Sequence, residues 1–141
     1  MHMLDVGCGS RKMVGCIGMD LNRNSDADVV ADATHLPFAN DSVDYVYSRR
    51  CLQHVPKDYA ALNEIWRVLK VSGEVELVLA SWRGWLYYRL FKRKPYSVFH
   101  LYWKGKIMRM LKRAGFHVKV LKLEATGRTF GRDWRVVAVK A

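Results

Sequence analysis

The stretch Leu4-Asp5-Val6-Gly7-Cys8-Gly9-Ser10 is a short apolar run that leads directly into a glycine-rich turn. A second apolar run follows it and ends at Asp20. Glycine adopts positive φ angles readily and lets a ligand approach the backbone, and a carboxylate at the end of the next strand can accept hydrogen bonds from both hydroxyls of a ribose. Together the two features predict a site for a nucleotide-type cofactor.

Apolar runs rich in β-branched residues predict buried parallel strands, because parallel strands are covered on both faces and lose the alternation of polar and apolar residues. Amphipathic helices are predicted over residues 57–70 and 103–114, and Gly115 is placed to end the second. The strand-forming runs lie at residues 2–6, 16–20, 28–31, 43–48 and 74–79.

The last two predicted strands, at residues 116–123 and 134–139, are separated by only the ten residues from Glu124 to Asp133. A connection of this length suits a hairpin and is too short for a parallel crossover that contains a helix. The order of elements therefore predicts an α/β fold with a mostly parallel sheet and an antiparallel C-terminal strand.

The first crossover of this sheet is unusually short, because only the nine residues from Gly7 to Gly15 connect the first two strands. Such a link can run back along a short strand but has no room for a full helix. One face of the sheet should therefore lose its cover, and we expect that face to be apolar. An exposed apolar face favours association, so the segment Trp82–Tyr102 or a second subunit in a homodimer is expected to fill the gap.

The segments after the glycine turn follow one another in the order Val29–Ala33, Leu36–Phe38, Ser42–Ser48, Leu52–Val55, Glu64–Glu74 and Ala114–Phe116. This order resembles the class I S-adenosylmethionine-dependent methyltransferases, and specifically the small type 11 methyltransferase domain, over about residues 3–80. The resemblance implies a Rossmann-like methyltransferase sheet and S-adenosylmethionine as the cofactor.

The resemblance also assigns cofactor contacts to individual residues. Gly7 and Gly9 stand where the family's first glycines lie under the methionine part of the cofactor. Asp20 is the candidate for the ribose, and Asp32, followed by Ala33, matches the acidic position that reads the adenine amino group. In a doubly wound sheet these strand ends meet at one rim.

Two further residues reach the same rim, namely Asp5 and the Ser48 end of the fourth strand. Asp5 is expected to hold the glycine turn through backbone amides. The third glycine of the family's pattern is replaced by Arg11, and Arg11 or Lys12 is a candidate partner for the cofactor's carboxylate. A nicotinamide site would require glycine at the position of Lys12, so methyl transfer is favoured over hydride transfer.

Methyl transfer mainly requires alignment of the acceptor with the methyl group, and a base is needed only where the acceptor loses a proton. His54 is the best-placed imidazole for that role, although a packed residue at a helix start fits it equally well. Arg49 and Arg50 follow the fourth strand and suit a phosphate or carboxylate of the acceptor. His100 and Tyr102 are candidates to line the acceptor pocket.

Charge divides the chain into two halves. Residues 1–81 contain 8 basic and 11 acidic side chains, whereas residues 82–141 contain 16 basic and 2 acidic side chains, which gives formal charges of −3 and +14. A basic half indicates an anionic partner, either RNA or a membrane surface, or else simply a well-solvated surface. The segment Trp82–Lys94 mixes aromatic and basic residues, as base stacking or an anionic membrane interface would require.

A length of 141 residues predicts a single methyltransferase-like domain, with a cofactor-binding half at 1–80 and a basic substrate- or partner-facing half at 81–141. No apolar run of about 18 residues and no signal peptide is found in the sequence, so we expect a cytoplasmic protein. The three cysteines lack metal-site spacing, and no metal is expected. The alternative to an enzyme is a catalytically silent cofactor-binding module that docks RNA, a membrane or a protein through the basic half.

Overall fold

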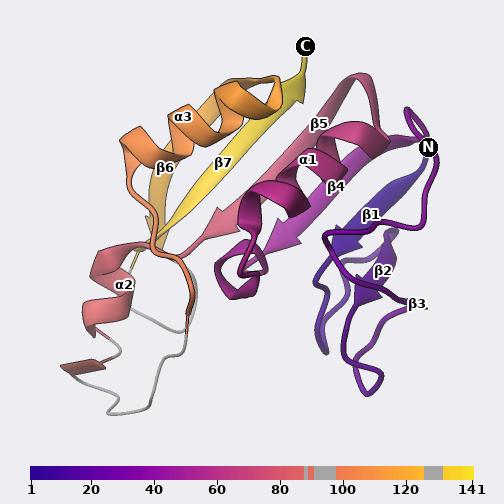
Figure 1. Cartoon of the computed structure of the whole chain (residues 1–141). Helices are drawn as coiled ribbons and strands as arrows, with labels where there is room; N and C mark the ends of the chain where they lie inside the picture. Colours follow the sequence, from indigo (N-terminus) through magenta and orange to yellow (C-terminus); the bar gives the residue numbers. More distant parts are fainter. Residues whose placement is uncertain (88, 91–97, 126–131) are drawn as a thin grey trace.

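The computed structural model describes residues 1–87, 89–90, 98–125 and 132–141, and within them seven strands form one sheet (Figure 1). All neighbouring pairs are parallel except those made by β7, which is antiparallel to both β5 and β6. This confirms the predicted α/β architecture. In spatial order the strands are β3 (Val29–Val30), β2 (Ile17–Asp20), β1 (Met3–Val6), β4 (Val43–Arg49), β5 (Leu69–Leu79), β7 (Arg132–Lys140) and β6 (Phe116–Ala125).

The helices among the described residues are the 3₁₀ turn η1 (Leu52–His54), α1 (Asp58–Val68), α2 (Trp82–Tyr87) and α3 (Lys104–Ala114). Figure 1 shows α1 and α3 side by side against one face of the sheet. None of these helices is both long and apolar enough to span a membrane. The core between helices and sheet includes Leu4, Val46, Leu62, Ile65, Val75, Leu77, Ile107 and Leu111, all at most 1% exposed.

The predicted elements are present with shifted ends. α1 ends at Val68, and Leu69 is already extended, so β5 begins before the end of the helix predicted from the sequence. α3 ends as predicted, because Gly115 adopts φ 97° and its amide bonds back to the last turn of the helix. The connection between β6 and β7 includes residues 126–131, which lie outside the described residues.

The short first crossover is confirmed, since the link between β1 and β2 consists of turns without a helix. The described links from β2 to β3 and from β3 to β4 contain no helix either. On the part of the uncovered face formed by β5, the prediction of an apolar surface is wrong. Along β5 the buried Val75 and Leu77 alternate with Glu74 and Glu76, and the two glutamates point to the uncovered face.

Polar contacts cover this open face in place of helices. The Tyr45 hydroxyl donates a hydrogen bond of 2.7 Å to Glu76, and Arg135 pairs with the other oxygen of the same carboxylate at 2.8 Å. Lys119 pairs with Glu74 at 2.8 Å. These paired charges reduce the apolar surface that the expected homodimer would bury on this part of the face.

The segment Trp82–Tyr102, proposed to cover that face, lies partly outside the described residues. Its described parts are fixed at the carboxyl end of β5. Ser81 and Tyr102 form an isolated parallel bridge, and the Tyr102 amide donates a hydrogen bond of 2.9 Å to the Ala80 carbonyl.

Candidate functional site

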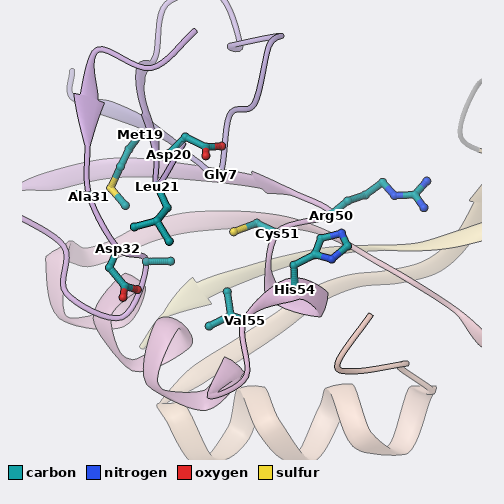
Figure 2. A pocket seen from close by; sticks show the side chains of 11 residues that line it. Gly7, Met19, Asp20, Leu21, Ala31, Asp32, Arg50, Cys51, His54 and Val55 are labelled. Atoms are coloured by element: carbon teal, nitrogen blue, oxygen red, sulfur yellow. The ribbon is translucent and has the colours of Figure 1, made fainter. Parts of the chain in front are cut away.

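A cavity of about 300 Å³ opens at the carboxyl ends of β1, β2 and β4. In Figure 2, Asp20 and Asp32 stand on one side of it, and Cys51, His54 and Val55 stand on the other. The cavity therefore brings together several residues selected from the sequence. Its lining consists of Gly7, Met19, Asp20, Leu21, Ala31, Asp32, Ala33, Arg50, Cys51, His54 and Val55.

The glycine turn contributes Gly7 to the lining of this cavity, whereas Gly9 lines a neighbouring cavity. Gly7 adopts φ 74°, and a Cβ atom there would lie 2.5 Å from the Cys51 sulfur. Its amide is held by a hydrogen bond of 2.7 Å to the Met19 carbonyl. Gly9 adopts φ 57°, but a Cβ atom there would meet nothing within 4 Å. The backbone at Gly9 thus faces open space that a ligand can enter.

Asp20 ends β2 and holds the turn in place. Its Oδ2 accepts a hydrogen bond of 2.9 Å from the Gly9 amide, and its Oδ1 accepts one of 2.9 Å from the Asn22 amide. A carboxylate offers about four lone-pair positions, so each oxygen retains a position for a further donor. The same carboxylate can therefore fix the glycine turn and receive hydroxyl groups in the cavity.

Asp32 follows β3 at the far side of the cavity. Its Oδ1 accepts hydrogen bonds of 2.8 Å from both the amide and the hydroxyl of Thr34. These bonds lower the pKa of the Asp32 carboxyl, which keeps it ionised at neutral pH. Ala33 is almost fully buried beside it and also lines the cavity.

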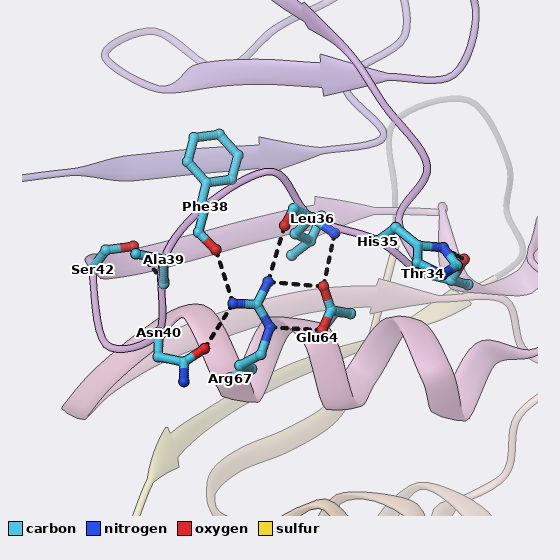
Figure 3. A network of polar contacts seen from close by, with 9 residues as sticks. All are labelled: Thr34, His35, Leu36, Phe38, Ala39, Asn40, Ser42, Glu64 and Arg67. Atoms are coloured by element: carbon cyan, nitrogen blue, oxygen red, sulfur yellow. Dashed lines mark hydrogen bonds and ion pairs between the residues drawn. The ribbon is translucent and has the colours of Figure 1, made fainter.

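The loop that carries Asp32 and Ala33 toward β4 contains no helix and is held by two side chains of α1 (Figure 3). Arg67 donates two hydrogen bonds, of 2.7 and 2.9 Å, to Glu64. The guanidinium also donates to the carbonyls of Phe38 and Leu36 at 2.8 and 2.9 Å. Glu64 in turn accepts a hydrogen bond of 2.8 Å from the Leu36 amide. The ion pair therefore satisfies both backbone carbonyls and a backbone amide of the loop.

Asp5 and Ser48 lie under the turn and are not among the residues that line this cavity. Asp5 accepts a hydrogen bond of 2.8 Å from the Met13 amide, the kind of backbone contact expected from the sequence. Burial raises the pKa of the Asp5 carboxyl, and the bond from Met13 opposes that shift. The Ser48 hydroxyl donates to the Val6 carbonyl at 3.0 Å and is buried.

A second cavity of about 430 Å³ lies beside the glycine turn and includes Arg11, Arg49 and Arg50 in its lining. Arg50 lines both cavities. It adopts φ 55°, which is rare for a residue with a side chain, and its guanidinium pairs with the buried Asp133 at 3.2 Å. Arg49 and Arg50 thus share the lining of the second cavity, and Arg50 is also held by Asp133.

Of the two cations considered for the cofactor's carboxylate, Lys12 is engaged elsewhere. Its ammonium pairs with Asp28 at 3.0 Å, and its stem packs against Gly18. Arg11 lines the second cavity and is exposed. The geometry thus favours Arg11 over Lys12 as a ligand contact.

His54 lies exposed at the rim of the first cavity, at the end of η1. The neighbouring Cys51 is held as a neutral thiol, because burial raises its pKa to about 11. A thiolate is the nucleophilic form of cysteine, so this residue shapes the cavity and is not a nucleophile at neutral pH.

Comparison with known proteins identifies the fold and the family. The chain matches a family described as a methyltransferase domain over residues 4–77, which is more than half of its length. It belongs to the methyltransferase domain family. The matched region contains both cavity carboxylates and the glycine turn.

Two curated relatives illustrate the range of this methyltransferase family. Phosphoethanolamine N-methyltransferase 2 of Caenorhabditis elegans is 36% identical over 82 residues, which cover 56% of this chain and 18% of that protein. Sterol 24-C-methyltransferase erg6 of Schizosaccharomyces pombe is 32% identical over 97 residues, which cover 51% of this chain and 26% of that protein. The matches therefore span about a quarter or less of these relatives.

Solved structures share the fold over nearly the whole chain. A SAM-dependent methyltransferase from Methanosarcina mazei has a TM-score of 0.77 at 18% identity, and the match covers 99% of this chain and 92% of that one. A putative methyltransferase solved with the Trm112 activator of Haloferax volcanii has a TM-score of 0.75 at 19% identity, covering 99% and 81%. This domain thus has the class I methyltransferase fold.

His100 and Tyr102 do not line either of these cavities of the methyltransferase domain. The His100 ring lies 2.8 Å from the Val55 carbonyl and fixes the loop before α1. Tyr102 is fully buried and donates a hydrogen bond of 2.8 Å to Asp58. The prediction that Tyr102 lines an acceptor pocket is corrected, because its side chain belongs to the core.

Sequence reasoning missed Cys51 and Asp133, which shape the site from outside the recognised motifs. Cys51 packs against Gly7, and nothing in its local sequence indicates that contact. For Asp133 a signal existed, since it is one of only two acidic residues in the strongly basic stretch 82–141. An isolated acid in such a stretch favours a specific cationic partner, here Arg50.

We expect substitution by alanine to lower the free energy of unfolding by different amounts at Gly7 and Gly9. In Gly7→Ala the new methyl group meets Cys51 and also requires an unfavourable positive φ, so we expect a loss of about 2–5 kcal/mol in the free energy of unfolding. Gly9→Ala meets open space and should lose only about 1–2 kcal/mol. Urea unfolding of both variants checks this, and equal losses would contradict the proposed contact between Gly7 and Cys51.

The ion pair of Arg67 and Glu64 with its hydrogen bonds to the loop, which we call the Arg67 clamp, should be important for stability. Arg67→Met retains the aliphatic stem but removes the hydrogen bonds that the guanidinium donates to the loop, and we expect it to lose about 1–3 kcal/mol in the free energy of unfolding. The control is Lys70→Gln, which breaks the exposed pair with Asp44 and should have little effect. An unchanged urea midpoint in Arg67→Met would show that the loop is held by other contacts.

The same clamp predicts a pH dependence. Hydrogen bonds from Arg67 hold the pKa of the Glu64 carboxyl below its ordinary value. Such a group stabilises the fold above its unfolded-state pKa, about 4.3 for glutamate, and this contribution is lost as pH falls through the folded-state pKa. Below about pH 4.3, wild-type stability should therefore fall more steeply than that of Arg67→Met. Urea unfolding at a series of acidic pH values measures both slopes, and parallel slopes would contradict the expectation.

Proposed function

We propose that this methyltransferase domain binds S-adenosylmethionine in the cavity of about 300 Å³ and transfers its methyl group to an acceptor. The observation that carries the proposal is the arrangement of Gly7, Asp20 and Asp32 around one cavity at the carboxyl ends of neighbouring strands. Ligands of open α/β sheets bind at this edge. Membership of the methyltransferase family supports the assignment.

The residues present fit such a cofactor. The open space beside Gly9 admits a ligand close to the backbone, and the spare lone pairs of Asp20 suit the two ribose hydroxyls. Asp32 is ionised and has hydrogen bonds on Oδ1 alone among the contacts of the described residues, so Oδ2 suits an amino group such as that of adenine. Ala33 contributes an apolar wall. When bound, the cofactor supplies an electrophilic methyl group.

The remaining candidates have supporting roles in this proposal. Asp5 and Ser48 hold the glycine turn against β1 and β4 from below, as their bonds to Met13 and Val6 indicate. Arg11, at the edge of the second cavity, pairs with the cofactor's carboxylate in place of the missing third glycine. Their contribution is to position the cofactor, and positioning accounts for much of the rate in such displacements.

The acceptor side of the site is assigned to the residues after β4. Arg49 lies in the second cavity with its guanidinium available for an anionic group of the acceptor, and Arg50 reaches both cavities. The exposed His54 at the rim removes a proton where the acceptor has one to lose. By their names, the relatives methylate phosphoethanolamine and a sterol, so both compounds belong in a first acceptor panel with labelled S-adenosylmethionine.

Calorimetric titration with S-adenosylmethionine and S-adenosylhomocysteine tests the cofactor site. We expect wild type to bind both, and Asp20→Ala to weaken binding by about tenfold to a hundredfold, because two hydrogen bonds to a charged group are removed. Asp44→Asn is the matched control, since Asp44 is bonded to His2 and Lys70 far from the cavity. Circular dichroism checks that each variant is folded.

Two results would count against the assignment. Binding by Asp20→Ala within a factor of about two of wild type would show that the ribose contact is misplaced. Failure of the folded wild type to bind either compound would overturn the proposed function itself.

A further inference from the structure

The stretch from Trp82 to Gly115 contains ten lysines and arginines and neither aspartate nor glutamate. It also holds six of the large apolar side chains that are exposed to solvent, with Phe99 at 65%, Leu90 at 59% and Trp82 at 54%. Such a concentration of exposed apolar surface marks an interaction site. We define the aromatic–basic patch by these six residues: Trp82, Leu86, Leu90, Phe99, Trp103 and Met108.

Backbone contacts gather much of this patch at one end of the sheet. The bridge between Ser81 and Tyr102 sets the neighbouring Trp82 and Trp103 on adjacent strands of backbone. The Phe99 amide donates a hydrogen bond of 2.9 Å to the carbonyl of Gln53. Figure 1 places α2 just beyond the carboxyl end of β5, the edge at which the cofactor cavity opens.

Cations accompany the exposed rings. The Arg83 guanidinium lies 5.7 Å from the Trp82 ring centre, and the Lys106 ammonium lies 5.4 Å from that of Trp103. On α3, exposed Met108 is flanked one turn away on each side by Lys104 and Lys112. Positive charges thus lie beside three of the six patch residues, Trp82, Trp103 and Met108.

We propose that the aromatic–basic patch docks the protein onto the surface of an anionic lipid bilayer. Tryptophan and phenylalanine insert at the boundary of headgroups and acyl chains, and neighbouring lysines and arginines pair with anionic headgroups. The groove between α1 and α3, with Lys106, Arg109 and Arg113 in its lining, provides further contacts for headgroups. In this proposal the groove and the patch contact the same membrane surface.

The composition of the patch favours lipid over RNA. Base stacking uses the flat faces of aromatic rings, whereas Leu86, Leu90 and Met108 have no such face and gain from burial among acyl chains. Over Trp82 and Trp103 a cation already occupies one ring face. A stacked base would have to displace it or use the other face.

Docking does not depend on the proposed function, but an inference about the class of acceptor rests on the proposed function. Phe99 is bonded to Gln53, and the next residue, His54, stands at the rim of the cavity. A bilayer that receives Phe99 therefore lies next to the cavity opening. If the cavity carries out methyl transfer, its acceptor class is one resident in the membrane.

Vesicle flotation near physiological salt tests the docking surface with the full chain. We expect wild type to float with phosphatidylglycerol–phosphatidylcholine vesicles and much less with phosphatidylcholine alone. Phe99→Ser combined with Trp103→Ser should weaken binding to the anionic vesicles by at least about tenfold. The matched control is Val14→Ser combined with Val71→Ser, two exposed apolar residues outside the patch, which should bind as wild type does.

Each alternative result overturns the inference. It fails if wild type does not float with anionic vesicles, if the patch variant floats as well as wild type, or if single-stranded RNA binds the patch more tightly than vesicles do. Affinity for S-adenosylhomocysteine is measured on the same samples. A variant that loses vesicles but keeps this ligand supports docking, whereas loss of the ligand in folded wild type bears on the proposed function alone.

Discussion

The clamp between Arg67 and Glu64 holds the part of the fold on which the site depends. The crossover from β3 to β4 contains no helix, so its backbone groups need partners from elsewhere. One guanidinium and one carboxylate on α1 satisfy the carbonyls of Leu36 and Phe38 and the Leu36 amide. The loop that begins with Asp32 is fixed by this means to α1, which packs against the sheet through Ala61, Leu62 and Ile65.

Carboxylates that accept backbone amides replace helices elsewhere in this half of the domain. Asp5 holds the Met13 amide, Asp20 holds Gly9, and Asp28 holds Gly18 at 2.8 Å while it pairs with Lys12. Each bond fixes a turn that would otherwise need a packed element for support. The acidic character of the N-terminal half is thus largely structural, and the cavity takes its carboxylates from the same framework.

Parallel strands bring their carboxyl ends to one edge, so the order of the strands predicted that Asp20 and Asp32 lie around one cavity, whereas their roles toward a cofactor were implied by the family resemblance. The alternation of Glu74 and Glu76 with Val75 also indicated a polar face. It was not used, because the sheet was assumed to be buried on both faces. The burial of Tyr102 was beyond local reasoning, because its partner Asp58 lies 44 residues away. The same holds for the contact of Cys51 with Gly7, which only the folded backbone creates.

The separation of charge between the halves, −3 and +14, has a consequence for motion as well as contact. A body with charges divided in this way carries a large electric dipole, and a charged surface exerts a torque on it as well as a pull. Near a polyanion, such a dipole favours orientations in which the C-terminal half faces the charged surface. Encounters therefore begin in a restricted set of orientations, and fewer collisions occur through the acidic N-terminal half.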